Sequence, residues 1–179
     1  MKWEGGLSDD PADSGGLTKY GVCQEFLSDC SKRHAEWLKE LGISNTGTIR
    51  AMVRSLSRPQ AEGLFRLAFW EPYRLDELPL AVAACVFDMN VNHGAGNAMK
   101  IAQRACNSLG AGLDVDGKIG PKTRAALAKM NSAKGVEALC EERRAFYRRI
   151  VAARPSQKVF LKGWLARTDD LERFAGGLV

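Results

Sequence analysis

The chain has few of the residues that metal and redox sites use. It contains only two histidines, His34 and His93, and its five cysteines form no Cys-x-x-Cys pair. Neither histidine has a metal-type partner at helical spacing, and a zinc site needs several nitrogen or sulfur ligands close together. We therefore expect no metal site and no cofactor.

The cysteines are odd in number, which does not suit a secreted disulfide framework. Three of them, Cys85, Cys106 and Cys140, lie in apolar stretches with helical spacing. This pattern predicts buried, reduced thiols in a chain that is made in a reducing compartment.

Long hydrophobic runs and the common nucleophile motifs are also absent. No apolar stretch approaches the length of a membrane span, and the first residues hold no apolar signal-peptide core. G-x-S-x-G, G-x-x-x-x-G-K-[ST] and H-E-x-x-H do not occur. We expect no stable membrane insertion, and the chemistry must depend on other side chains.

Charge of one sign is only slightly in excess. The 179 residues carry a net charge of +5, and no run of five or more Lys or Arg occurs. This favours a solvated surface, although nucleic acid, an anionic membrane surface or an anionic cell-wall polymer would each suit the charge. A nucleic-acid binder would depend on charge alone, so we do not expect one. A hydrophobic content of 45% and a length of 179 residues suit one folded domain, which can consist of two lobes.

Helical periodicity runs through most of the chain, whereas strand signals are weak outside a possible short hairpin within residues 5–18. Ser57 and Gln60 have the spacing of a capping box, and Pro121 suits the first turn of a helix. The pattern predicts a mainly α fold. The expected helices cover residues 20–41, 49–56, 61–70, 80–87, 98–109, a segment from 121 and residues 136–151, with a further segment near the C-terminus.

Residues 80–87 are all apolar, so we expect this helix to be buried on every side. Its far end turns polar at Asp88, Asn90, Asn92 and His93, and Asp88 and Asn92 would share a face. Such an end is typical of a cleft wall that binds a ligand. A helix that simply leaves the core would have the same pattern, and the residues alone do not decide between the two.

The opening loop offers carboxylates for acid–base chemistry. A carboxyl at Glu4, packed beside Trp3 and partly removed from water, would have a raised pKa and could act as a general acid. Glycoside hydrolysis needs a second carboxylate, which Asp9, Asp10 or Asp13 could supply. A solvated turn is the alternative, since acidic loops rich in Gly and Pro usually have no catalytic role.

The same stretch resembles a known family, the glycoside hydrolase family 108 lysozymes. These are N-acetylmuramidases of phages and bacteria, related to a secretion-activator protein. The second half is similar to the type 3 peptidoglycan-binding region that accompanies that family. The matching residues of the first half are Glu4-Gly5-Gly6, Asp10-Pro11, Asp13, Gly15-Gly16, Thr18 and Gly21-Val22. Those of the second half are Phe87-Asp88, Val91-Asn92, Gly94, Ala98, Gln103, Asp116-Gly117, Ile119-Gly120-Pro121, Thr123, Arg144 to Tyr147, Phe160 to Trp164 and Arg167.

The resemblance implies a helical, lysozyme-like fold of the α+β type and cleavage of the β-1,4 bond between N-acetylmuramic acid and N-acetylglucosamine. Glu4 matches the family's catalytic acid. Asp13 lies nine residues later, where related lysozymes have an aspartate, and Thr18 matches a following threonine. The family commonly has a tyrosine after its Glu-Gly-Gly, where this chain has Leu7. Tyr20 and Trp70 are the candidates to supply a sugar-stacking ring instead.

The resemblance also implies two lobes that pack as one body, a catalytic lobe over residues 1–84 and a peptidoglycan-binding lobe over residues 85–179. We expect Tyr20, Trp70, Asp88, Asn90 and Asn92 to bind the substrate, and bacterial peptidoglycan to be the partner of a monomer. Such lysis enzymes are made in the host cytoplasm, leave through a holin-like pore and act in the periplasm or cell wall. The alternative is a non-catalytic peptidoglycan-binding protein with a decayed active site.

Overall fold

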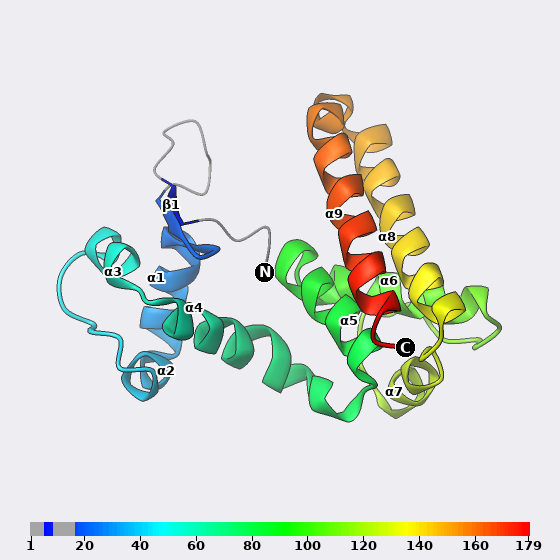
Figure 1. Ribbon diagram of the computed structural model, residues 1–179, viewed down its shortest axis with the longest axis horizontal. Coiled ribbons are helices and arrows are strands. Elements are labelled where there is room, and N and C mark those ends of the chain that lie inside the picture. Colours follow the sequence, from blue (N-terminus) through cyan, green and yellow to red (C-terminus); the bar gives the residue numbers. More distant parts are fainter. Residues whose placement is uncertain (1–5, 9–16) are drawn as a thin grey trace. The chain divides into compact units, whose positions relative to one another are not determined.

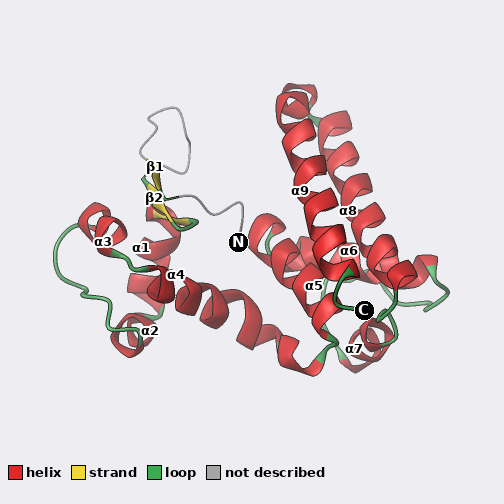
Figure 2. Ribbon diagram, viewed as in Figure 1, coloured by secondary structure: helices red, strands yellow, loops and turns green. Residues whose placement is uncertain are grey.

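The computed structural model of the protein describes residues 6–8 and 17–179 (Figure 1). Contacts within the chain divide it into two compact units, residues 1–68 (unit 1) and 69–179 (unit 2). The lobe boundary that the resemblance implies, between residues 84 and 85, lies within helix α5 (Leu80–His93). Helices dominate both units (Figure 2), which confirms the mainly α fold class.

Unit 1 begins with a small antiparallel sheet in the order β1-β2-β3. Leu7 pairs with Lys19 and Ser8 with Thr18, which confirms a hairpin in the opening segment. The second hairpin was not expected, because helical spacing continues through this stretch of the sequence. The strands are β1 (Leu7–Ser8), β2 (Thr18–Lys19) and β3 (Val22–Cys23).

The helix expected over residues 20–41 is shorter and interrupted. It begins only after Cys23, whose side chain caps it by accepting from the Phe26 amide, and it breaks at His34. Gly42 ends the second part as predicted, because its φ of 63° is a left-handed conformation that suits glycine. The two parts are α1 (Gln24–Arg33) and α2 (Ala35–Glu40).

The capping box is confirmed in both directions. The Gln60 amide donates to the Ser57 hydroxyl, and the Ser57 amide donates to the Gln60 side chain at 2.9 Å. The helix it starts does not continue regularly to Trp70, because its last turns widen into a π-helix before Pro72. These elements are α3 (Ile49–Ser55), α4 (Arg58–Phe65), the π-helix η1 (Arg66–Trp70) and the 3₁₀ turn η2 (Glu71–Tyr73).

Unit 2 is built around α5, as the apolar run predicts. Ala81, Val82, Cys85, Val86 and Met89 are almost completely buried. Helices α6, α8 and α9 pack against α5, and the long helices α8 and α9 run side by side (Figure 1). The further elements are η3 (Leu75–Glu77), α6 (Ala95–Ser108), α7 (Pro121–Ala128), α8 (Ala133–Ala153), η4 (Pro155–Gln157) and α9 (Lys158–Gly176).

Two further sequence expectations can be compared with the described residues. All five cysteines are free, and four of them are buried. Among the described residues, no helix combines the length and apolarity that crossing a bilayer requires.

Candidate functional site

The predicted catalytic residues lie at the start of unit 1. Glu4 and Asp13 fall outside the described residues, as do the alternatives Asp9 and Asp10. Thr18 is described, and it stands opposite Ser8 in the β1–β2 pair. The sheet therefore holds Thr18 beside the strand that follows the Glu4 segment directly in sequence.

Tyr20 stands at the turn that joins β2 to β3. Tyr20 and Gly21 have φ values of 51° and 81°, the positive pair that a two-residue hairpin of type I′ requires. A bulky residue rarely adopts this conformation, and such strain is found most often at functional sites. Two cations lie over the Tyr20 ring, Lys19 Nζ at 5.4 Å and the Arg58 guanidinium at 5.9 Å from its centre.

Two predicted substrate-binding residues lie in unit 2, Trp70 next to its first residue and Asn90 in helix α5. Trp70 is half-buried and meets Phe87 edge to face, with ring centres 5.6 Å apart. Asn90 is fully buried, and its amide nitrogen donates to the Phe69 carbonyl at 3.1 Å. Asn90 thus ties α5 to the widened helix η1, and its burial favours a structural role over direct contact with a sugar.

Asp88 lies in a network of ion pairs. One carboxylate oxygen accepts from Arg167 Nη2 at 2.7 Å, and the other lies 2.6 Å from Arg143 Nη1. Asn92 donates from the same face, to the Asp88 carbonyl at 2.6 Å and to its carboxylate at 3.3 Å. This confirms that the two share a face. Burial raises the pKa of Asp88, but Arg143 and Arg167 outweigh it, so the pKa lies below its ordinary value.

His93 contacts both Arg143 of this network and a group of aromatic rings. Its Nε2 accepts from Arg143 Nε at 3.2 Å, which requires a neutral ring. Burial lowers the pKa of His93 to about 4, and the positive charge of Arg143 acts in the same direction. The ring also contacts Phe146 and Tyr147, and Tyr147 stacks on Trp164 at 4.9 Å.

Arg143 is the main residue of this network that sequence reasoning missed. It is completely buried, and it lies in the expected helix over residues 136–151, which contains several arginines. A signal was present, because Arg143 lies four residues from both Leu139 and Tyr147, on the apolar face of that helix. A charge on a buried face needs a buried partner, and Asp88 at the end of the apolar helix is the matching carboxylate.

The His93 environment leads to a prediction about pH. In the folded protein the His93 ring stays neutral until the pH falls to its pKa of about 4. In the unfolded chain the same ring takes up a proton near its ordinary pKa of 6.5. The unfolded state therefore binds more protons between these values, and stability is lost as the pH falls from about 6.5 to about 4. We expect a loss of about 3 kcal/mol in the free energy of unfolding over this window. Asp88 adds a further loss only below its own unfolded pKa.

Urea unfolding at a series of pH values measures this effect. The His93→Gln variant keeps an oxygen that can accept from Arg143 but cannot titrate. We expect its stability to change much less over the same window. Equal slopes for wild type and variant would contradict the assignment to His93.

Comparison with known protein families bears directly on the first half of the chain. The model of the family described as glycosyl hydrolase 108 matches residues 1–94, which include the segment with Glu4, Asp13 and Thr18 and the whole of helix α5. The chain belongs to the glycosyl hydrolase 108 family. A second model, described as a predicted peptidoglycan domain, matches residues 97–169.

A solved structure supports the same conclusion for this glycosyl hydrolase 108 member. The chain is similar to SagA from Brucella abortus, with 29% sequence identity and a TM-score of 0.74. The alignment covers 98% of this chain and 88% of that one. No curated protein matches the chain. Together the matches identify a glycoside hydrolase family protein that cleaves or binds peptidoglycan.

The two family regions and the two compact units divide the chain at different places. The glycosyl hydrolase 108 match extends to Gly94, which ends α5, whereas the contacts divide the chain after Ala68. Helix α5 thus belongs to the hydrolase region by sequence and forms the centre of unit 2 by packing.

Proposed function

We propose that the protein is an N-acetylmuramidase, a lysozyme that cleaves the β-1,4 bond between N-acetylmuramic acid and N-acetylglucosamine. The observation that carries this proposal is the glycosyl hydrolase 108 match over residues 1–94, together with the Glu-Gly-Gly motif at its start. Peptidoglycan as the partner follows from the second match.

In this proposal Glu4 is the general acid. It protonates the glycosidic oxygen as the bond to the leaving sugar breaks, and charge builds on the sugar ring that remains. Asp13 stabilises that positive charge or, with Thr18, positions the attacking water. Glu4 precedes strand β1 closely in the sequence, and β1 pairs with β2, which begins at Thr18. This pairing supports the assignment of both residues to one site.

Tyr20 is our candidate for the ring that stacks on a sugar. Its ring lies beside Lys19 and Arg58, and its positive φ is a kind of backbone strain that clusters at functional sites. Trp70 is the second candidate, since its side chain is only partly buried. For Asp88 and Asn90 we propose that they support the substrate site by fixing α5 rather than by touching the glycan, and Asn92 remains the exposed candidate on that helix.

The test is digestion of purified peptidoglycan followed by mass spectrometry of the soluble products. A muramidase releases fragments whose new reducing end is N-acetylmuramic acid. Release with N-acetylglucosamine at the reducing end would contradict the assignment of the bond. Binding to the wall without any release would favour the alternative, a peptidoglycan-binding protein with a decayed active site.

We further propose that the protein acts as a monomer in the periplasm or cell wall, after synthesis in the cytoplasm and passage through a holin-like pore. This part depends on the resemblance to phage lysozymes. Light scattering of the purified protein checks the monomer. Fractionation of cells that express the protein with and without a holin tests the export route. We expect wall degradation only in the cells that contain the holin.

A further inference from the structure

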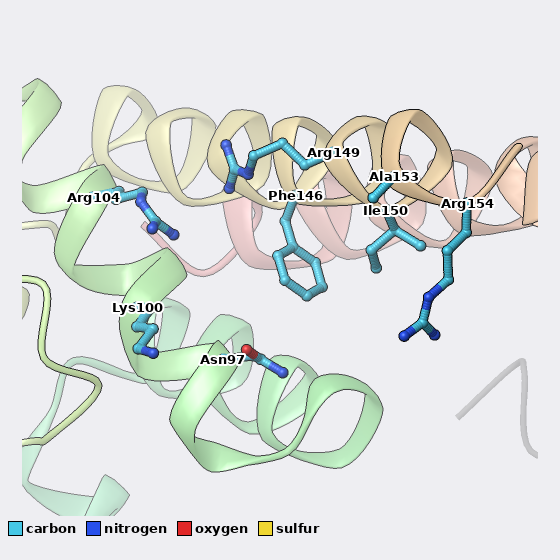
Figure 3. A pocket seen from close by; sticks show the side chains of 8 residues that line it. All are labelled: Asn97, Lys100, Arg104, Phe146, Arg149, Ile150, Ala153 and Arg154. Atoms are coloured by element: carbon cyan, nitrogen blue, oxygen red, sulfur yellow. The ribbon is translucent and has the colours of Figure 1, made fainter.

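Unit 2 contains a cavity that is lined by several cations and by none of the proposed catalytic residues. Its volume is about 560 Å³, within the range of roughly 300–1,000 Å³ that is usual for small-molecule sites. Asn97, Lys100 and Arg104 recur at three- and four-residue steps, so they share one face of α6. Figure 3 shows this face turned towards α8, which closes the cavity from the other side.

The facing wall on α8 and the residue after it combine apolar and charged groups. Phe146, Ile150 and Ala153 form an apolar stripe, again at steps of four and three residues. Arg149 and Arg154 lie along the stripe (Figure 3). The cavity is thus bounded by an apolar strip with basic groups at its edges, a composition that suits a ligand with both carbon groups and negative charges.

The charge of this wall is unbalanced. Lys100, Arg104, Arg149 and Arg154 contribute four positive charges, and no acid lines the cavity among the described residues. In the part of the chain that the structure describes, Arg149 is the member of this set with an acidic neighbour, Glu142, whose carboxylate lies 3.9 Å from the guanidinium. A separation of 3.9 Å is long for an ion pair, and half of the Arg149 side chain is exposed, so its guanidinium is held weakly and can turn to a ligand. The net field therefore attracts an anion.

Contacts within the protein order two polar side chains of the wall, Asn97 and Lys100. The Asn97 amide nitrogen donates to the His93 carbonyl at 3.0 Å, which directs the amide oxygen away from that bond, on the side of α8 in Figure 3. The carbon stem of Lys100 packs close to Gly117, where an added Cβ would lie 3.3 Å from the Lys100 Cε. An ordered acceptor beside cations suits a ligand with peptide N–H groups as well as carboxylates.

We propose that this cavity binds the stem peptide of peptidoglycan. The proposal rests on peptidoglycan being the partner of this chain. The N-acetylated sugars of the glycan carry no charge on their rings, whereas the stem peptides carry free carboxylates, alanine methyl groups and peptide N–H groups. The four cations match the carboxylates, the apolar strip of α8 matches the methyl groups, and the Asn97 oxygen matches an N–H. The protein would thus bind the wall through the peptides as well as through the glycan.

The test compares two soluble probes by titration calorimetry. One is the disaccharide of N-acetylglucosamine and N-acetylmuramic acid with its tetrapeptide. The other is the same disaccharide with its lactyl carboxyl group capped as a simple amide in place of the peptide, so that it carries no charge. Neither contains a further bond for a muramidase to cut, so binding is measured without catalysis. We expect the wild type to bind the peptide-bearing probe more tightly, and the difference to shrink between about 0.05 M and about 0.5 M salt.

The double variant Arg149→Gln/Arg154→Gln removes two of the charges. We expect its affinity for the peptide-bearing probe to fall roughly five- to tenfold, since exposed charge pairs are individually weak. The matched control is Lys122→Gln/Lys129→Gln on and just after α7, which removes the same charge from exposed positions outside the cavity and should bind as the wild type does. Circular dichroism spectra check that both variants fold.

Three results would overturn the proposal. They are equal affinity for both probes, equal loss in the cavity and control variants, and displacement of the peptide-bearing probe by inorganic phosphate at the same concentration. The last result would make the cavity a general anion site instead. Failure of the muramidase proposal is a separate outcome, because it shows as a lack of cleavage of peptide-free glycan strands by the wild type and leaves these titrations interpretable.

Discussion

Replacing Glu4 by glutamine is expected to lower the rate of peptidoglycan hydrolysis by roughly 10²–10⁴-fold, the usual contribution of a general acid. Glutamine has nearly the same shape as glutamate and can hydrogen-bond to the glycosidic oxygen, but it cannot transfer a proton. The loss should therefore appear in kcat, with little change in wall binding. Release of reducing ends from purified peptidoglycan measures the rate, and sedimentation with the insoluble wall measures the binding.

The matched control for this experiment is Glu25→Gln, an exposed glutamate in the first turn of α1. It loses the same charge in the same unit and should keep full activity. Activity of Glu4→Gln at the level of this control would show that Glu4 is not the acid. The companion series Asp9→Asn, Asp10→Asn and Asp13→Asn identifies the second carboxylate, and we expect only the change at Asp13 to be severe.

The largest expected effect on stability is at Asp88. The Asp88→Asn variant leaves Arg143, which is completely buried, without its ionised partner. Breaking a buried ion pair from one side costs about 3–5 kcal/mol, because the remaining charge stays out of water. Arg167 is less affected, since about a fifth of its side chain reaches solvent. Urea unfolding followed by circular dichroism measures the loss.

The control is Asp169→Asn, which removes a carboxylate that pairs with Arg144 at 2.6 Å on the surface. Its side chain is 57% exposed and Arg144 keeps Glu141 and Glu172 as partners, so we expect a loss below about 1 kcal/mol. The double variant Asp88→Asn/Arg143→Leu should lose less stability than the sum of the losses of the two single variants, because it removes the buried charge together with its partner. Simple additivity, or a loss at Asp88 equal to the control, would contradict the buried network.

Local signals in the sequence predicted local structure well. Ser57 and Gln60 cap each other, Gly42 stops a helix and Pro121 starts one, because each of these effects depends on residues within one turn. The apolar run over residues 80–87 likewise predicted the central helix, since a helix without a polar face has to be buried.

Features that depend on distant residues could not be predicted in the same way. The hairpin at Tyr20 is stabilised by pairing with β1 and by Arg58, neither of which the local helical spacing reveals. The polar end of α5 illustrates the point for the site. Asp88 and Asn92 do share a face, but Asp88 meets Arg167, a residue 79 positions later in the sequence. The local pattern could not show that this carboxylate pairs with two arginines, because both come from distant parts of the sequence.

Helix α5 also limits how this protein can have been assembled from parts. A gene fragment that encodes only the peptidoglycan domain, residues 97–169, lacks the helix against which Ala98, Ile101, Val136, Leu139 and Cys140 form one buried cluster. Carried to another protein alone, that fragment would expose this apolar surface and aggregate. The compact unit that contains this whole cluster begins near residue 69, within the hydrolase region. The peptidoglycan domain and the last part of the hydrolase sequence therefore share one core, and a fragment that keeps this core has to contain both.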